Sequence, residues 1–377
     1  MTLPLATRNS SLILIMAGGT GGHVYPALAV AEQLRDWGVD VVWLGTRTGL
    51  EARVVPAAGF ALDAVKVSGL RGKGLVQRVL APFMLLWAFL QSLLIMLRRR
   101  PGAVLGMGGY VSGAGGVSAW LLRRPLLIHE QNAVAGLTNR VLARFATRVF
   151  EAFPNTFPAG HHALHTGNPV RAAITAVAAP EQRLAAHQGP LRLLVLGGSL
   201  GARAINRLLP EALALLEPAT RPQVWHQAGR SHYDEVPVAY QNCGVEARVV
   251  PFIEDMAEAY AWADLVLCRA GAMTIAELAA VGVAAILVPY PHAVDDHQTG
   301  NAHYLCDAGA GILIQQDDLS AAGLSAMLRE FSTDRARLLR MAQAARALAK
   351  PDATRQVAQH CLAAAGITLT LPTEATH

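Results

Sequence analysis

Two glycine-rich loops, each directly after an apolar run, are the residues of this chain best suited to chemistry. The first is Gly18-Gly19-Thr20-Gly21-Gly22-His23, after the run at 12–16. Glycine lets the backbone approach a ligand closely, and the N–H groups at the start of a following helix attract negative charge. The second loop, at 197–202, follows the run at 193–196. Two strand–glycine–helix units half a chain apart predict two nucleotide-type α/β domains that face one cleft.

Two familiar phosphate-binding motifs do not fit the first loop. A dinucleotide-binding fingerprint that starts at Gly19 would need glycine where Val24 stands, and Gly45-Thr46-Arg47 lacks the acidic ribose ligand. A P-loop is excluded because no Gly-Lys-Ser/Thr sequence follows the glycines. A loop that serves only as a turn stays open, although so many glycines cost conformational entropy.

His23 stands at the expected start of the helix that follows the first loop. The positive end of a helix disfavours imidazolium, so a neutral ring beside a phosphate-binding loop is suited to act as a general base. The alternative, a histidine that only caps the helix or packs against it, stays open.

The segment Thr274-Ile275-Ala276-Glu277 also has two interpretations. It matches a capping box, in which the threonine caps a helix that starts there and the glutamate reaches back. Alternatively, Glu277 accepts two hydrogen bonds from a ribose diol while the N–H groups around Ala272 and Met273 hold phosphate. The two interpretations are compatible, because protein groups need occupy only part of the cap.

The elements that must position these residues alternate between strand-like and helix-like runs in both halves. Strands are predicted at 41–45, 104–106, 125–128, 193–196, 265–267 and 285–288. Such alternation predicts α/β domains with parallel sheets, whose ligands collect at the carboxyl ends of the strands. A domain boundary is expected at Gly167-Asn168-Pro169, which is turn-rich and precedes a polar connector at 172–190.

Composition narrows the class of protein. The 377 residues are 53% hydrophobic and 16% charged, which is unusually apolar and suggests membrane contact. The net charge of +5 favours anionic partners. Nucleic acid is not expected, because the basic residues alternate with apolar runs and lack a base-stacking pattern. The four cysteines show no metal or disulfide spacing, which predicts a reduced, cytoplasmic protein. The apolar block near the N-terminus is interpreted as a strand rather than a signal peptide.

One apolar segment, Leu80 to Leu97, has basic residues on both sides. As a helix, its stretch from Pro82 would be about 24 Å long, which is short against about 30 Å of hydrocarbon. Each flanking Lys or Arg could add about 1 kcal/mol of attraction to an anionic leaflet. We therefore favour a helix that lies in the membrane interface over a spanning one, with burial in the domain core as the open alternative.

A series of motifs runs along nearly the whole chain. In order they are GGTGGH at 18–23, SGLRGKG at 68–74, GMGGYVSG at 106–113, HEQN at 129–132, GNPVR at 167–171, GGS at 197–199, WHQ at 225–227, FIEDM at 252–256, AWAD at 261–264 and PDAT at 351–354. Each motif alone is weak, but this series in this order closely resembles the MurG family of peptidoglycan N-acetylglucosaminyltransferases.

The resemblance implies the GT-B fold, an α/β architecture of two Rossmann-like domains with parallel sheets that face a central cleft. Residues 1–168 would bind the acceptor and the membrane, with 351–365 packing back onto them, and 169–350 would bind UDP-N-acetylglucosamine (UDP-GlcNAc). The implied reaction is inverting transfer of GlcNAc to the 4-hydroxyl of undecaprenyl-pyrophosphoryl-MurNAc-pentapeptide, which converts lipid I to lipid II.

The resemblance also assigns residues to the two substrates. Donor contacts are implied for Thr20, Gly21, Gly22, Asn132, Arg171, Ser199, Ile253, Ala272, Met273, Thr274, Glu277 and Gln298. In this set Ile253 would read uracil through its backbone and Glu277 would hold the ribose. Acceptor contacts are implied for Gly18, Gly19, Gly108, Gly109, Tyr110 and Glu130.

His23 would be the catalytic base, oriented by Glu130 or a neighbouring carboxylate. Backbone N–H groups and the helix dipole at 272–277 would stabilise the leaving UDP, so we expect no cofactor and no metal. The chain has no Asp-x-Asp at a strand end, and Asp295-Asp296 falls in a loop. We also expect a peripheral position on the cytoplasmic face of the cell membrane, at an anionic surface, with other cell-wall synthesis proteins as further partners.

Three places depart from the family pattern. Leu200 replaces a glutamine and Ala270 replaces a serine, so no side-chain contact is assigned at either position, and 291–298 lacks the usual Lys and Arg. Two rival functions stay open: another GT-B UDP-sugar glycosyltransferase or epimerase, and a non-catalytic UDP-binding peripheral membrane protein. The segments 106–113 and 129–132 favour the lipid I enzyme over the first rival. The second rival would bind UDP but show no turnover with lipid I.

Overall fold

The computed structural model describes residues 12–66, 75–198 and 201–368, with the side chains of 75–81 and 294 outside the description. The chain forms two compact units. The first unit comprises Met1–Gln131, Ala135–Pro169 and Asp352–His377, and the second comprises Asn132–Val134 and Val170–Pro351.

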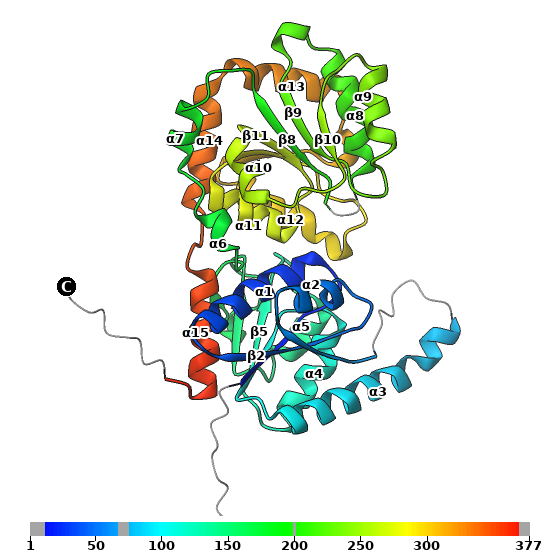
Figure 1. Ribbon diagram of the computed structural model, residues 1–377, viewed down its shortest axis with the longest axis vertical. Coiled ribbons are helices and arrows are strands. Elements are labelled where there is room, and N and C mark those ends of the chain that lie inside the picture. Colours follow the sequence, from blue (N-terminus) through cyan, green and yellow to red (C-terminus); the bar gives the residue numbers. More distant parts are fainter. Residues whose placement is uncertain (1–11, 67–74, 199–200, 369–377) are drawn as a thin grey trace, which may run out of the picture. The chain divides into compact units, whose positions relative to one another are not determined.

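The first unit is built on a seven-stranded sheet in the order β3-β2-β1-β4-β5-β6-β7, with parallel pairing throughout (Figure 1). The strands are β1 (Leu12–Met16), β2 (Asp40–Gly45), β3 (Ala61–Ala64), β4 (Ala103–Gly106), β5 (Leu126–Glu130), β6 (Arg148–Glu151) and β7 (Leu164–His165). The helices are α1 (Gly21–Asp36), α2 (Glu51–Ala57), α3 (Leu75–Arg99), α4 (Tyr110–Leu121), α5 (Leu137–Leu142) and α15 (Ala353–Ala365).

Alternate residues of β1 enter cores on opposite faces of this sheet. Ile13 and Ile15 pack in a core shared with α1 and α15, which lie side by side. Leu14 and Met16 pack on the other face, in a core that includes residues of α3 and α4. Burial on both faces explains why these strands appear in the sequence as short apolar runs.

The order of the strands reverses between β1 and β4, where Met16 pairs with Gly106. Ligands of doubly wound sheets bind beyond the carboxyl ends of the strands at such a switch point. The glycine loops at 17–20 and 107–109 leave these two strands. The fold therefore brings two of the predicted loops together.

The second unit repeats this design with a six-stranded parallel sheet in the order β10-β9-β8-β11-β12-β13. Its strands are β8 (Arg192–Leu196), β9 (Gln223–Gln227), β10 (Arg248–Val250), β11 (Leu265–Cys268), β12 (Ala284–Leu287) and β13 (Gly311–Leu313). Its helices are α6 (Ala172–Thr175), α7 (Pro180–Ala185), α8 (Arg203–Ala214), α9 (Glu235–Asn242), α10 (Met256–Trp262), α11 (Ala272–Val281), α12 (His297–Cys306), α13 (Ala321–Thr333) and α14 (Arg335–Ala347). Its switch point lies between β8 and β11. The predicted pair of parallel α/β sheets is confirmed.

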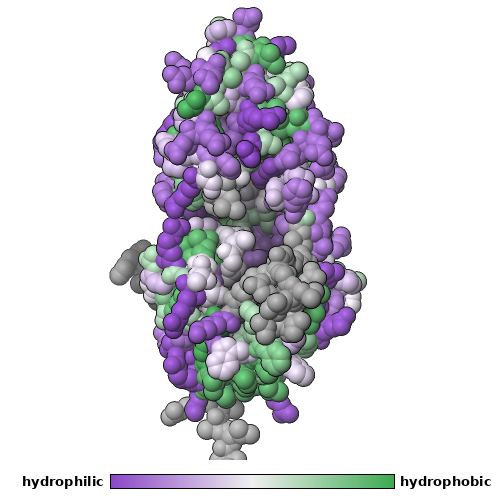
Figure 2. Space-filling view, turned by 90° about the vertical axis from the view of Figure 1, so that its right-hand side faces the viewer, coloured by the Kyte–Doolittle hydropathy of each residue, from purple (hydrophilic) through white to green (hydrophobic). Residues whose placement is uncertain are grey.

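The apolar segment forms most of α3, and only 17% of its stretch Pro82–Arg99 is buried. By length and composition this stretch could cross a membrane. Ala88, Ser92 and Met96 are buried, whereas Phe83 and Trp87 are exposed. Burial in the domain core is therefore wrong for most of the described side chains of this helix. Figure 2 shows hydrophobic side chains gathered on the surface of the unit that carries α3.

Candidate functional site

The first glycine loop leads directly into α1. The helix begins at Gly21, inside the glycine motif and two residues before His23. Thr20 is the N-cap by backbone conformation, and its carbonyl oxygen accepts from His23 N and Val24 N over 3.1 and 3.2 Å. The buried indole of Trp43 donates to Ala17 O over 2.8 Å, which fixes the end of β1. His23 thus sits in the first turn of α1, with the helix N–H groups beside it.

The ring of His23 is held between the two glycine loops. Its Nδ1 lies 3.3 Å from Gly18 O. Gly108 faces the other side of the ring so closely that a Cβ there would lie 2.9 Å from Nε2, and its φ of +97° favours glycine. The loops also touch through their backbones, because a Cβ at Gly109 would lie 2.5 Å from Gly18 O. The predicted acceptor glycines and the predicted base therefore form one cluster.

Ser112 stabilises the junction of these loops. Its hydroxyl lies 2.7 Å from Gly108 O and 3.1 Å from Met16 O, and the side chain is buried in α4. Tyr110 begins α4 with its ring about half exposed. Ser112 therefore connects this loop to the end of β1, while Tyr110 faces solvent.

Glu130 and His129 end β5 and are both buried. Glu130 Oε2 accepts from Gly136 N over 3.0 Å and from Asn139 Nδ2 of α5 over 2.9 Å. His129 Nε2 lies 3.0 Å from Gly167 O, and burial lowers the pKa of His129 to about 4. These bonds fix the end of β5, where the predicted acceptor residue Glu130 lies.

A carboxylate that the sequence analysis missed reaches the first glycine loop. Glu51, the first residue of α2, is fully buried and accepts from Gly19 N over 3.1 Å. Its other oxygen accepts from Thr46 N and from the Thr46 hydroxyl. Nothing local in the sequence connects Glu51 with Gly19, because the two residues are 32 positions apart.

In the second unit, the loop after β8 is held by Gln227. Its Nε2 donates to Gly198 O over 3.2 Å, and its Oε1 accepts from Ile253 N over 2.9 Å. The predicted donor residue Ser199, with Leu200, lies outside the described residues, as do residues 68–74. Gln227 was missed as a site residue although its motif was recognised.

The predicted capping box of α11 is wrong. The helix begins at Ala272 with Gly271 as N-cap, so Thr274 lies within the first turn. Glycine at the N-cap needs no side-chain bond, and Glu277 is instead directed into the unit. The N–H groups of Ala272, Met273 and Thr274 point out of the helix start, as an anion site requires.

Glu277 is held by a tyrosine and an arginine. Tyr260 donates its hydroxyl hydrogen to Glu277 Oε2 over 3.0 Å, and Arg171 Nη2 lies 3.5 Å from Oε1. Burial raises the pKa of Glu277, while Arg171 and the Tyr260 hydrogen bond oppose that rise. Tyr260 was not among the predicted site residues.

Asn301, also missed, fixes the short segment that contains Asn132. It is fully buried, and its Oδ1 accepts from Ala133 N over 2.8 Å. Its Nδ2 lies 3.3 Å from Asn132 Oδ1 and 3.1 Å from Ala270 O.

The last predicted donor residue, Gln298, is the second residue of α12. Its Oε1 accepts from Tyr290 N over 2.9 Å, so this side chain orders the loop before the helix.

Among the described residues, no three His, Cys, Asp or Glu side chains are placed to hold a metal ion.

Comparison with known domains agrees with the two units. The glycosyltransferase family 28 N-terminal domain matches residues 13–151, and the family 28 C-terminal domain matches residues 192–357.

Full-length relatives match as well. The chain is 57% identical over 350 residues to a UDP-N-acetylglucosamine--N-acetylmuramyl-(pentapeptide) pyrophosphoryl-undecaprenol N-acetylglucosamine transferase of Nitrosococcus oceani, covering 93% of this chain and 98% of the relative. It is 59% identical over 350 residues to the transferase of the same name from Alkalilimnicola ehrlichii, with the same coverage. The crystal structure of Acinetobacter baumannii MurG is 43% identical, with a TM-score of 0.80 over 93% of this chain and 99% of that one.

Proposed function

Because this chain belongs to glycosyltransferase family 28, we propose that its glycine loops serve the two substrates of one reaction. The enzyme transfers N-acetylglucosamine from UDP-GlcNAc to undecaprenyl-pyrophosphoryl-N-acetylmuramyl-pentapeptide, converting lipid I to lipid II in peptidoglycan synthesis. We expect direct displacement at the anomeric carbon, with inversion, by the muramyl 4-hydroxyl.

The donor belongs to the second unit in this proposal. Glu277 is held by Tyr260 and Arg171 so that its carboxylate can accept from the ribose hydroxyls. The first turn of α11 offers N–H groups to the diphosphate. Ile253 N already donates to Gln227, so Ile253 would read the base through its carbonyl oxygen.

The acceptor belongs to the first unit, and His23 is the base. The observation that carries this proposal is that both glycine loops close around the ring of His23. The Gly18 carbonyl can only accept, so Nδ1 carries the hydrogen in the neutral ring and Nε2 is the basic nitrogen. Nε2 removes the proton from the attacking hydroxyl as the sugar–phosphate bond breaks. The α11 helix dipole then stabilises the charge that develops on the leaving UDP.

The enzyme is a peripheral membrane protein in this proposal, and the exposed part of α3 meets an anionic surface on the cytoplasmic face. Phe83 and Trp87 are exposed by 69% and 56%. Arg98 and Arg99, at the end of α3, bond to Asp63 and so anchor the helix. Aromatic side chains of this kind bind at the membrane interface.

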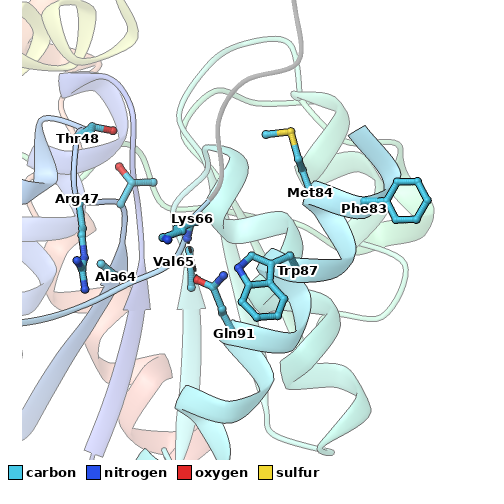
Figure 3. Close-up of a pocket in the computed structure, with 10 residues that line it drawn as sticks. Arg47, Thr48, Ala64, Val65, Lys66, Phe83, Met84, Trp87 and Gln91 are labelled. Carbon is cyan, nitrogen blue, oxygen red and sulfur yellow. Dashed lines mark hydrogen bonds between the residues drawn. The ribbon is translucent and has the colours of Figure 1, made fainter. Parts of the chain in front are cut away.

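A cavity of about 700 Å³ lies where α3 meets the loops after β2 and β3. Figure 3 shows Arg47 and Lys66 on the strand side of the cavity and Met84 and Trp87 on α3. Cations beside apolar side chains suit a surface of anionic lipid headgroups and acyl chains. The cavity therefore supports the membrane orientation that we propose for this unit.

The direct test is incubation with radiolabelled UDP-GlcNAc and a lipid I analogue. We expect a labelled lipid II analogue, with UDP-GalNAc and UDP-glucose as donor controls. H23A should lower kcat by about 10²-fold or more, the usual contribution of a general base. A loss of less than tenfold would remove His23 as the base, and UDP binding without turnover would indicate a non-catalytic protein.

A further inference from the structure

The peptide group that joins Gly18 to Gly19 is engaged at both ends. Its carbonyl oxygen lies 3.3 Å from His23 Nδ1. Its N–H donates to Glu51 Oε2 over 3.1 Å. One planar group therefore connects a carboxylate to the ring of the proposed base.

Glu51 is held so that both of its oxygens face hydrogen-bond donors. Its Oε1 accepts from Thr46 N over 3.0 Å and from Thr46 Oγ1 over 2.6 Å. The same threonine oxygen accepts from Gly49 N over 3.0 Å, which fixes the hydroxyl. An ionised carboxylate suits this site, because it accepts at both oxygens and presents no hydrogen of its own.

Some of the nearby glycines make room for this carboxylate. A Cβ at Gly18 would lie 2.8 Å from Glu51 Oε1, and a Cβ at Gly49 would collide with the same group. Part of the glycine content that suggests a bound phosphate is thus required by a side chain of the chain itself.

We propose that Glu51 is a positioning residue that acts on His23 through the Gly18–Gly19 peptide, an inference that rests on the proposed role of His23. A carboxylate that accepts from the peptide N–H polarises the group and strengthens its carbonyl oxygen as an acceptor. The carbonyl then keeps the ring hydrogen on Nδ1. When Nε2 takes the proton of the attacking hydroxyl, Nδ1 keeps its hydrogen, Glu51 stays a carboxylate, and the carbonyl stabilises the imidazolium.

A carboxylate that merely ties together the loops after β1 and β2 would make the same bonds. The two roles differ in their dependence on the ring. A tie between loops supports the anion-binding backbone whatever residue stands at position 23, whereas positioning has an effect only while His23 is present. A double-mutant cycle on turnover separates the two roles.

The first experiment compares E51Q, H23A and the double variant with the wild type in the radiolabelled transfer assay. The amide of E51Q carries no charge and has only one acceptor oxygen for the two backbone donors, Gly19 N and Thr46 N, so the polarisation of the peptide is weakened. We expect kcat to fall about tenfold or more in E51Q, because a poorly positioned base loses part of the roughly 10²-fold or more that a general base usually contributes. The KM for UDP-GlcNAc should be unchanged. In the H23A background, the same change should alter the residual kcat by less than about twofold.

Glu151 provides the matched control. It is a buried carboxylate of the same unit that accepts from Asn155 N and Phe157 N, both over 3.1 Å. E151Q should therefore disturb stability as E51Q does but leave kcat unchanged. If E51Q does not fold, T46V removes one bond to the carboxylate and should lower kcat about threefold, again only while His23 is present.

A spectroscopic measurement tests the inference independently of turnover. In ¹⁵N-histidine-labelled protein, the His23 ring, assigned by its absence from H23A, should be the Nδ1–H tautomer, and E51Q should shift it toward a mixture. Two results would overturn the role of Glu51 alone. One is wild-type kcat in folded E51Q; the other is an equally large fall in kcat when E51Q is added to H23A. An H23A enzyme that keeps more than a tenth of wild-type kcat would overturn the base assignment and, with it, this inference.

Discussion

The Tyr260 hydroxyl donates a hydrogen bond to the Glu277 carboxylate over 3.0 Å, from α10 to the neighbouring α11. Tyr260 is fully buried, and burial raises its pKa well above the usual value, so the phenol stays protonated as a donor. One oxygen of Glu277 is therefore already fixed within the second unit. In the proposed mechanism this bond aims the carboxylate at the ribose.

Tyr260→Phe tests that role. Without the hydroxyl, Glu277 loses the hydrogen bond that fixes its carboxylate, and a hydrogen bond to a charged group contributes about 1.5–3 kcal/mol. The Kd for UDP-GlcNAc should therefore rise about tenfold. Glu277→Ala removes both proposed ribose bonds and should raise Kd about 100-fold. Isothermal titration calorimetry measures both values.

The control is Tyr240→Phe, which removes another buried hydroxyl of the same unit. That hydroxyl lies 2.9 Å from His226 Nδ1 and belongs to a different part of the core. Its loss should leave Kd within about twofold of the wild type, since it removes no bond in the proposed donor site. Equal effects of the two tyrosine changes would mean that Tyr260 acts only through general stability.

Sequence patterns predicted the strands and glycine loops because parallel strands buried on both faces form apolar runs that end at the ligand edge. They did not predict the partners of Glu277. The predicted capping box is wrong because the N-cap of α11 is Gly271, three residues before Thr274, and the partner of Glu277, Tyr260, comes from another helix. Glu51 was missed for a similar reason: its bond to Gly19 spans 32 residues and depends on β2 lying beside β1.

Gly108→Ala should damage catalysis more than folding. A Cβ at this position would lie 2.7 Å from His23 Cδ2, and the φ of +97° adds strain of about 1–2 kcal/mol for any other residue. The ring must move away from Gly18 O, so we expect kcat to fall about 100-fold, as when the base is lost. Steady-state kinetics with the lipid I analogue gives the value.

Gly38→Ala isolates the strain from the collision. Gly38 also has a positive φ, of +74°, but a Cβ there meets no heavy atom within 4 Å. This variant should lose similar stability to urea and keep wild-type kcat. Comparable turnover in the two variants would show that Gly108 does not constrain the ring.

Trp87→Ser should weaken binding to phosphatidylglycerol vesicles about tenfold, because burial of a large apolar side chain contributes about 1.5–3 kcal/mol. Lys66→Gln should weaken it about fivefold, and only on anionic vesicles, because one cation adds about 1 kcal/mol at such a surface. Co-sedimentation with phosphatidylglycerol and with phosphatidylcholine vesicles separates the two contributions.

Leu215→Ser is the control for Trp87→Ser. Leu215 follows α8 in the second unit and is 56% exposed, the same fraction as Trp87. Its loss should leave vesicle binding unchanged. If both serine variants bind equally well, α3 is not the membrane contact.

The second unit should lose stability in mild acid through His226. This histidine is fully buried in β9, and burial lowers its pKa to about 3. Asn206 Nδ2 donates to Ala228 O, so its Oδ1 accepts from His226 Nε2 over 3.1 Å, and Nδ1 accepts from the Tyr240 hydroxyl. Both ring nitrogens are thus satisfied in the neutral form. A proton added at Nδ1 would turn this nitrogen into a donor, and the Tyr240 hydroxyl hydrogen would lose its acceptor.

The unfolded chain binds a proton at this histidine below about pH 6.5, whereas the folded chain does so only near pH 3. Stability that is complete above pH 6.5 is therefore lost as the pH falls, by about 2 kcal/mol at pH 5 from this residue alone. Hydrogen exchange of β8 and β9 amides in urea, at pH 7.5 and pH 5.0, reports the change within the second unit. His226→Gln should be less stable at pH 7.5 yet lose about 2 kcal/mol less between the two values, while His292→Gln, at an exposed position, should follow the wild type. An unchanged pH dependence in His226→Gln would show that other groups cause the acid sensitivity.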